Sequence, residues 1–470
     1  MRVSDLMGLG REALKFSAVI VILVLAGWGI AYKLIYKTVF HGKKRLTVKT
    51  AFSHGLFLAV ILVIVYVTLL RGQFYGGIPS LIPFSSYRLA WYQFNGAEWR
   101  NLILNICMFI PFGFMLPAAN ERFRKAWKTY LAGFAFTLLI ETLQLILKRG
   151  IFETDDLINN FLGTVIGYGF FSMAFAIRNR RFSKKILVLQ TPFLLVLLSF
   201  ALIFTIYSRK ELGNMVYEYT SGHKMPEVSV SGEIVLSSEE AVGNIYQAEI
   251  ATVEETHRLA EEIFALQGDT IDESRTDIYD NTAVYYSEES GLSLWIDYKG
   301  STVDYTNFEL AFPRDGSKCK YLSGADEQTV RGALEKIGFT VPEQAAYAEK
   351  DGTYLFDADG VLAGDQYCIG KVSCRLNEQG IVTDMDYNVV MCELAGQVPL
   401  ISTQEAYDLL RGGTFCYWYC VPEDRPLTVT GVELVYFADT KGFYQPLYRF
   451  VLENGNEEGM QIDIPAGKKD

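Results

Sequence analysis

Histidine is scarce in this sequence: four occur among 470 residues, and the part from residue 211 to 470, here called the second half, contains only His223 and His257. The second half also lacks the motifs of serine hydrolases, zinc proteases and P-loop nucleotide-binding proteins. Its most closely spaced cysteines, Cys416 and Cys420, are too far apart for a CxxC pair and have no matching histidine, so we expect no zinc site. We therefore predict no metal and no cofactor, and an enzyme is the less favoured interpretation.

Each half of the chain is poor in charge of one sign. Residues 1–210 contain 25 Lys and Arg but 8 Asp and Glu, whereas residues 211–470 contain 18 Lys and Arg but 46 Asp and Glu. Such a break in composition indicates a domain boundary, and we predict a transmembrane domain at 1–207, a linker at 208–225 and an acidic domain at 226–470. The acidity favours solubility and a cationic partner. We expect no nucleic-acid partner.

Long apolar runs are absent from the second half but frequent in the first. About 20 helical residues cross the roughly 30 Å of membrane hydrocarbon. The first run is too long for a signal peptide and is followed by no small-residue cleavage site, so we interpret it as a span. We predict an all-α membrane bundle of about six transmembrane helices, at Phe16–Tyr36, Ala51–Leu70, Asn101–Pro117, Trp127–Leu147, Leu157–Ile177 and Ile186–Tyr207.

The distribution of Lys and Arg among the loops predicts the orientation of this bundle. The loops after the first, third and fifth spans contain 15 of these residues, and the segments on the other side contain 10 over a longer stretch. Because loops rich in Lys and Arg stay in the cytoplasm, the N-terminus and the acidic domain should lie outside. The expected location is the cell membrane, as a multi-pass protein with an extracellular C-terminal domain.

Six of the seven cysteines lie in the second half, and two interpretations of them are open. An even number in an extracellular domain suits disulfide bonds, but the same residues could remain reduced and buried. The seventh, Cys107, lies in a predicted span as a small buried side chain. The six are Cys319, Cys368, Cys374, Cys392, Cys416 and Cys420.

Polar residues interrupt three neighbouring spans at a similar depth, toward the outer leaflet. Glu141 lies seven residues before Lys148, about 10 Å below the membrane surface. Ionisable groups in a bilayer cost roughly 2.5–3.5 kcal/mol on insertion scales, so they should face the bundle interior, with Arg149 as the partner of the carboxylates. The predicted cluster comprises Asn101, Asn105, Glu141, Gln144, Arg149, Asp155, Asp156 and Asn160.

Two interpretations of this cluster are also open. The amides could simply bridge helices, and Gly163 and Gly167 form a GxxxG spacing at which another helix can approach closely. Three carboxylates, however, exceed what one nearby arginine neutralises. The excess of acid favours a bound cation, a cationic ligand or a proton.

The same segments resemble the VanZ-like family of bacterial membrane proteins over about residues 75–170. The matching pieces are SLIPFSSYR, NLILNICMFIPFGFMLP, and IETLQ followed by KRGIFETDDLINNFLGTVIGYG. The founding member is associated with teicoplanin resistance, so the resemblance implies a role at the cell envelope but no established reaction. The long acidic domain departs from a plain VanZ-like protein. Candidate helix-packing positions in the matching segments are Pro111, Gly113, Gly163 and Gly167.

Residues 226–470 predict an α+β domain with antiparallel sheet. Capping boxes beginning at Thr252 and Ser402 open two helices, and residues 326–340 have the same outline. Hairpin signals are also present, so two or three subunits of helix plus strands are expected. Asp357 and Asp359 stand in an FDADG segment, for which an ordinary turn is favoured over a calcium loop.

Three hypotheses on function follow. The favoured one is a non-enzymatic envelope protein whose cluster binds a lipid headgroup, a wall precursor or a glycopeptide and lowers glycopeptide sensitivity. In the second, an intramembrane enzyme acts on a lipid-linked phosphate, with Glu141 as general base and Asp155 and Asp156 holding a divalent metal. In the third, the chain is an envelope sensor or scaffold that signals through another membrane protein. Membrane lipids are expected partners in each case.

Overall fold

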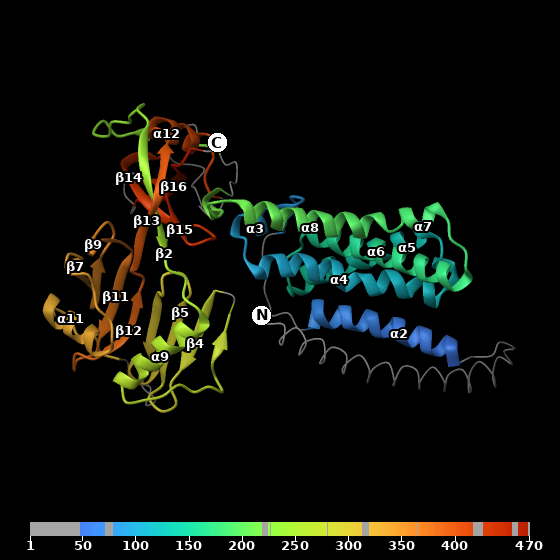
Figure 1. Ribbon diagram of the computed structural model, residues 1–470, viewed down its shortest axis with the longest axis horizontal. Helices are drawn as coiled ribbons and strands as arrows, with labels where there is room; N and C mark the ends of the chain where they lie inside the picture. Colours follow the sequence, from blue (N-terminus) through green and yellow to red (C-terminus); the bar gives the residue numbers. More distant parts are fainter. Residues whose placement is uncertain are drawn as a thin grey trace. The chain divides into compact units, whose positions relative to one another are not determined.

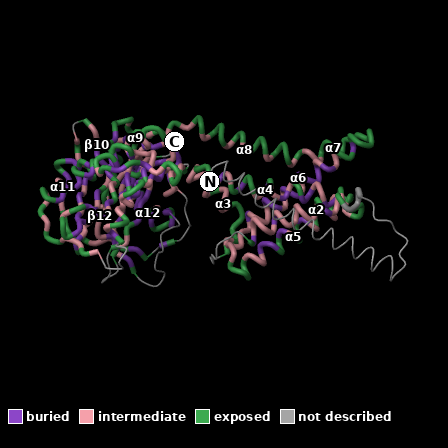
Figure 2. Tube along the Cα trace, turned by 90° about the horizontal axis from the view of Figure 1, so that it is seen from below, coloured by how far each residue is buried: buried purple, intermediate pink, exposed green. Residues whose placement is uncertain are grey.

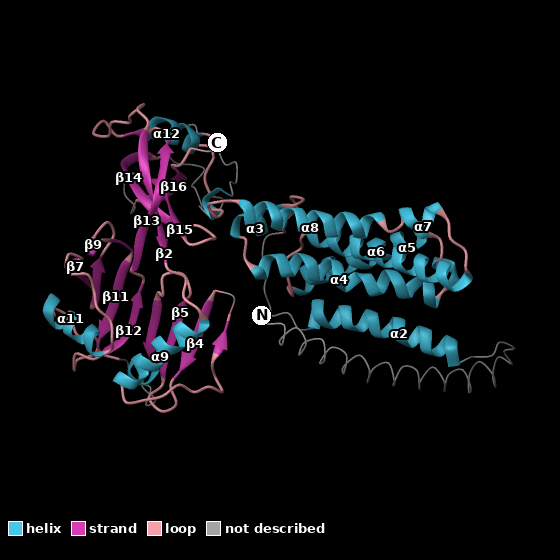
Figure 3. Ribbon diagram, in the orientation of Figure 1, coloured by secondary structure: helices cyan, strands magenta, loops and turns pink. Residues whose placement is uncertain are grey.

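The computed structural model describes residues 48–70, 79–218, 224–225, 227–279, 281–312, 319–363, 365–416, 426–453 and 459–468. The chain divides into two units, Met1–Lys210 and Glu211–Asp470. The first is helical and the second is rich in antiparallel sheet (Figures 1 and 3). The predicted fold class, a helical membrane part plus a soluble α+β domain, is confirmed. The expected span at Phe16–Tyr36 lies outside the described residues.

Five helical spans in the described part of the first unit are long and apolar enough to cross a membrane. The third predicted span begins earlier than expected, at Gly96, because the Asn95 side chain accepts the Glu98 N–H at 2.8 Å and caps the helix. A short helix absent from the prediction, α3, precedes it. The elements are α2 (Val48–Val65), the π-helix η2 (Tyr66–Leu70), α3 (Ser85–Gln93), α4 (Gly96–Ala119), the 3-10 helix η3 (Glu121–Phe123), α5 (Ala126–Leu147), α6 (Thr154–Asn179), α7 (Lys184–Val188) and α8 (Thr191–Arg209).

Glycines bring α4 and α6 into backbone contact at the centre of the bundle. A Cβ atom on Gly163 would lie 2.1 Å from the Ile106 carbonyl oxygen, and one on Gly167 would lie 2.1 Å from that of Ile110. Gly113 faces α6 in the same way. By contrast, α8 buries no residue and is exposed along most of its length (Figure 2). A helix this apolar and this exposed suits contact with lipid.

The first sheet of the second unit is antiparallel throughout, in the order β3-β4-β5-β6-β12-β11-β8-β7. Phe264 of α9 and Leu334 of α11 are fully buried in one core with this sheet (Figure 3). The predicted capping box of α9 forms, with Thr252 and Glu255 each bonding the other's backbone N–H. The elements are α9 (Val253–Leu266), β3 (Asp277–Ile278), β4 (Thr282–Tyr286), β5 (Leu292–Asp297), β6 (Val303–Asn307), α10 (Phe308–Ala311), α11 (Glu327–Lys336), β7 (Ala346–Lys350), β8 (Thr353–Asp357), β11 (Lys371–Leu376) and β12 (Val382–Tyr387).

The second sheet runs in the order β1-β14-β15-β2-β13-β10-β9, with β16 also paired to β15. In sequence, β9 and β10 lie between β8 and β11 of the first sheet, but they belong to the second sheet. The chain therefore passes from the first sheet to the second and back. Helix α12 packs on this sheet through Ala406 and Leu410. The elements are η4 (Val216–Glu218), β1 (Ser229–Val230), β2 (Ala241–Ala248), β9 (Leu362–Ala363), β10 (Gln366–Ile369), β13 (Val390–Leu400), α12 (Thr403–Arg411), β14 (Thr428–Ala438), β15 (Phe443–Glu453) and β16 (Met460–Pro465).

Two carboxyl groups of the second unit have shifted pKa values of opposite sign. Desolvation of Asp269 acts to raise its pKa, but hydrogen bonds from Ser290, Thr270 and Glu289 outweigh it and lower the pKa to about 2. Asp386 stands directly across from Asp304 on the neighbouring strand. Partial burial and the charge of Asp304 raise the pKa of Asp386 to about 6.

The thiols of Cys107, Cys319, Cys368, Cys374 and Cys392 are free, and the Cys416 thiol donates to the Val216 carbonyl at 3.7 Å. For these the reduced interpretation agrees with the structure, and Cys420 lies outside the described residues. Cys107 is exposed on the bundle surface, and the expectation that it is buried is wrong. Within the segment expected as a linker, the Gly213 N–H donates to Asp439 at 2.6 Å, and Met215 is buried.

A candidate polar site in the helix bundle

Three helices contribute polar side chains at one junction of the bundle. Asn105 of α4 donates its side-chain N–H to the Asp156 carboxylate of α6 at 2.5 Å. One turn further along α6, the Asn160 side-chain N–H donates to the Thr137 hydroxyl of α5 at 3.0 Å. Glu141 lies one turn along α5 from Thr137 and so shares its face of that helix. Asp156 likewise shares a face of α6 with Asn160.

The Glu141 carboxylate is buried at 1% exposure. One of its oxygens accepts the backbone N–H of Glu153, at the start of α6, at 3.5 Å. This is a long hydrogen bond, and it leaves most of the acceptor capacity of the carboxylate unused. Glu141 is therefore a buried acid whose charge is weakly compensated by the protein.

Asp155 makes different hydrogen bonds from its neighbour Asp156. Its two oxygens accept the backbone N–H groups of Phe84 at 2.5 Å and Ser86 at 2.8 Å. These are orphan donors at the start of α3, where Phe84 has the left-handed φ of 63° and gives no side-chain cap. Asp155 thus caps α3 from a distant part of the chain. Each Asp155 oxygen accepts one of these N–H groups, and the hypothesis that Asp155 and Asp156 together hold a metal stays a prediction.

Helix α3 is tied to the site by two further contacts. The Tyr87 hydroxyl donates to the Asn159 side-chain oxygen, and the Ser86 hydroxyl donates to the Glu153 carboxylate at 3.1 Å. The preceding segment pairs with the turn before α6, since the Thr154 N–H donates to the Ser80 carbonyl at 3.0 Å. Sequence reasoning missed these contacts. The available signal was the pair of serines in SLIPFSSYR, which is typical of a helix start.

Four carboxylates lie close to one another at this junction, those of Glu141, Glu153, Asp155 and Asp156. In the part of the chain that the structure describes, no ion pair within 4.0 Å involves Glu141, Glu153, Asp155 or Asp156. Among the described residues, the Asn160 side-chain oxygen and the Asn159 side-chain nitrogen at this junction are buried without a hydrogen-bond partner, as is the side-chain oxygen of Gln144 further along α5. Each such atom costs about 1–3 kcal/mol when it stays unpaired.

Three residues of the predicted cluster, Asn101, Gln144 and Arg149, are not among those that the structure brings together at this junction. Asn101 is exposed on α4, one turn before Asn105. Arg149 lies in the turn after α5, where its backbone N–H donates to the Gln144 carbonyl at 3.0 Å, and its ion pair with the carboxylates stays a prediction. The Gln144 side chain reaches η2 instead and donates to the Thr68 carbonyl at 3.2 Å. The structure thus brings together Asn105, Glu141, Asp155, Asp156 and Asn160.

Known proteins match the same region of the chain. The family model described as VanZ/LLP1 matches residues 57–178. Protein VanZ of Enterococcus faecium is 26% identical over 151 residues, which cover 31% of this chain and 89% of that protein. A crystal structure of an uncharacterized protein from Eubacterium rectale covers 50% of this chain and 85% of its own, with 10% identity and a TM-score of 0.28, too weak a likeness to support a conclusion. The residues matched to the family include the helices that build the polar junction, and residues 57–178 form a VanZ-like domain.

Proposed function

We propose that this chain is a non-enzymatic protein of the bacterial cell envelope that lowers sensitivity to glycopeptides. In this proposal the polar junction lies in the outer leaflet and binds the head group of a lipid, a wall precursor or a glycopeptide. The bundle crosses the membrane several times, and the acidic unit lies outside the cell.

One observation carries the proposal: four carboxylates gather among α3, α4, α5 and α6 with no ion pair to a basic side chain in the described residues. Interhelical bridging alone calls for amides and hydroxyls, as in the contact between Asn160 and Thr137. An excess of carboxylates in a low-dielectric site favours a ligand that brings positive charge or several hydrogen-bond donors. Ammonium and amide groups of head groups and glycopeptides meet this requirement.

Binding of fluorescent teicoplanin to intact cells tests the proposal. Cells expressing the wild-type chain should bind less of the label than cells without it, and Glu141→Gln should restore binding. Glutamine has nearly the same shape as glutamate, so the variant removes charge without opening a cavity. Membrane levels of each variant are matched by immunoblot.

Glu121→Gln is the matched control. Glu121 is exposed, and it pairs with Arg124 at 2.8 Å on the short loop after α4, outside the polar junction. This variant should behave as the wild type. Equal protection by the wild type and Glu141→Gln would refute a role for the junction, and no protection by either would refute the envelope-protection function itself.

The proposed orientation has its own test. Val235 is 91% exposed in the second unit, and Val235→Cys introduces an accessible thiol there. A membrane-impermeant maleimide added to intact cells should label this variant more strongly than the wild-type chain. Labelling only after the cells are opened would place the acidic unit in the cytoplasm.

A further inference from the structure

A cleft of about 740 Å³ opens in the second unit, beside the strands that pass between its two sheets. Its walls come from the end of β2, the turn between β5 and β6, β10, and the passage from β12 to β13. This volume lies within the roughly 300–1,000 Å³ typical of small-molecule sites.

The walls of the cleft are held by backbone hydrogen bonds. The Gly300 N–H donates to the Glu249 carbonyl at 2.8 Å, and the Ala251 N–H donates to the Tyr298 carbonyl at 2.7 Å. Gly300 has a φ of +76°, and a Cβ atom there would lie 2.5 Å from a methyl group of Val390. The turn therefore packs directly against the start of β13. A ligand would enter a cleft that is already formed.

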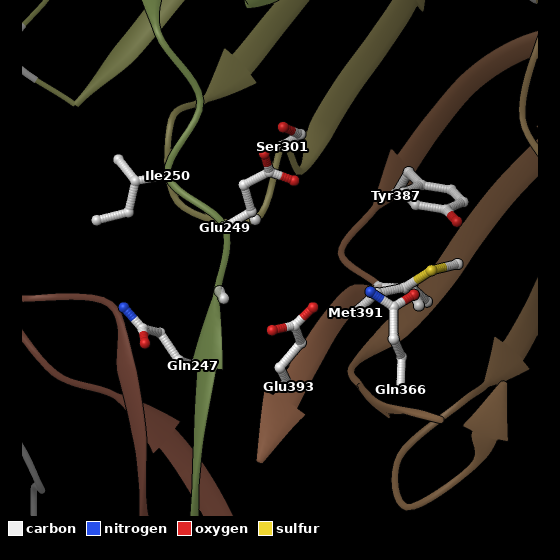
Figure 4. A pocket seen from close by; sticks show the side chains of 11 residues that line it. Gln247, Glu249, Ile250, Ser301, Gln366, Tyr387, Met391 and Glu393 are labelled. Atoms are coloured by element: carbon white, nitrogen blue, oxygen red, sulfur yellow. The ribbon is translucent and has the colours of Figure 1, made fainter. Parts of the chain in front are cut away.

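Two carboxylates point into this cleft, those of Glu249 and Glu393 (Figure 4). Within the described residues neither forms an ion pair within 4.0 Å. None of the lining residues is Lys, Arg or His. The nearest lysine in sequence, Lys299, directs its ammonium group to the Asp439 carbonyl at 3.2 Å. Among the described residues, the cleft thus offers two carboxylates that pair with no basic side chain.

The remaining lining residues are apolar or neutral and polar. Ile250 and Met391 are about half exposed, at 50% and 43%. Gln366 and Ser301 add neutral hydrogen-bonding groups (Figure 4). Apolar surface beside carboxylates suits an aliphatic chain that ends in an ammonium group, whereas an anion would be repelled. The unit around the cleft, residues 211–470, contains 46 acidic and 18 basic residues and would attract such a cation from a distance.

We propose that this cleft is a binding site for alkylammonium ligands, with Glu249 and Glu393 as the anionic contacts. A free diamine and a lysine side chain of a peptide share this chemistry. The proposal is independent of the polar junction in the helix bundle, because all of its residues belong to the second unit.

Isothermal titration of the full chain in nanodiscs with 1,5-diaminopentane tests the proposal. Pentane-1,5-diol has the same chain without charge, and glutarate has the opposite charge, so neither should bind. Glu249→Gln and Glu393→Gln should each weaken diamine binding about tenfold or more. The control Glu335→Gln removes the same charge from an exposed position on α11 and should change binding less than twofold.

A peptide with a single lysine, titrated in parallel, identifies the source of the ammonium group. Tighter binding of this peptide than of the diamine would identify a peptide ligand, and the reverse would identify a free diamine. The proposal is overturned if the diamine does not saturate the protein. It is equally overturned if Glu335→Gln weakens binding as much as the cleft variants do, because the attraction would then be diffuse.

Discussion

Removal of the Asp155 carboxylate should release the start of α3. In Asp155→Ala the backbone N–H groups of Phe84 and Ser86 lose acceptors at 2.5 and 2.8 Å. Asp155 is 1% exposed, so water cannot easily replace it. A hydrogen bond to a charged group contributes about 1.5–3 kcal/mol. Taking the lower figure for each bond, the free energy of local opening at α3 should fall by about 3 kcal/mol.

Hydrogen–deuterium exchange in nanodiscs measures this change. Because 1.4 kcal/mol corresponds to a tenfold change, the amides at the start of α3 should exchange about 100-fold faster in Asp155→Ala. Asp155→Asn keeps one acceptor oxygen and should give an intermediate increase of about tenfold. Amides in the middle of α8, a helix with no part in this cap, serve as the internal reference.

An unchanged exchange rate in peptides covering Phe84 to Gln93 would refute the reasoning. A uniform increase across the whole bundle would refute it too, because the cap would then act on global stability. Loss of a buried charge relieves desolvation and so acts in the opposite direction on global stability. The local measurement at α3 is therefore more decisive than a melting temperature.

Three other predictions concern packing and pH. Gly167→Ala should push α4 and α6 apart against the Ile110 carbonyl and lower stability by about 1–3 kcal/mol, measured as a lower melting temperature in detergent; an unchanged value would contradict the contact. The lowered pKa of Asp269 means that the ionised form stabilises the fold, so the urea midpoint of the second unit's transition should fall as the pH drops from about 4 to 2, and Asp269→Asn should remove this dependence. The pKa of Asp386 beside Asp304 is raised, so its effect on stability is the reverse: stability is lost as the pH rises from about 4 to 6. Asp386→Asn should therefore be more stable than the wild type at about pH 7 and equally stable below about pH 4. A fixed difference between this variant and the wild type at all pH values would exclude titration as the cause.

The helix-packing glycines show how far periodicity carries a prediction. The GxxxG spacing of Gly163 and Gly167 already indicates a face on which another helix can come close. The partner is not encoded in that spacing, because several helices of the bundle could approach it. Only the structure identifies α4, through the carbonyl oxygens of Ile106 and Ile110.

The polar junction was also predictable in part from helix periodicity. Residues on one face of a helix, such as Asp156 and Asn160, follow from a spacing of four. Contacts with α3 do not, since Tyr87 and Asn159 lie far apart in sequence and no local pattern relates them.

By itself the sequence determines what depends on composition and local period. Apolar runs long enough for a bilayer, the charge break near residue 210, the capping box at Thr252 and the family of residues 57–178 belong to this class. Tertiary structure alone decides which distant groups meet: that Asp155 caps α3, that Glu141 is buried beside the start of α6, and that Glu249 and Glu393 share a cleft. The physical reason is the distance along the chain over which each interaction acts. Helix periodicity and capping act over a few neighbouring residues, whereas desolvation and pairing of charges depend on segments that the fold brings together.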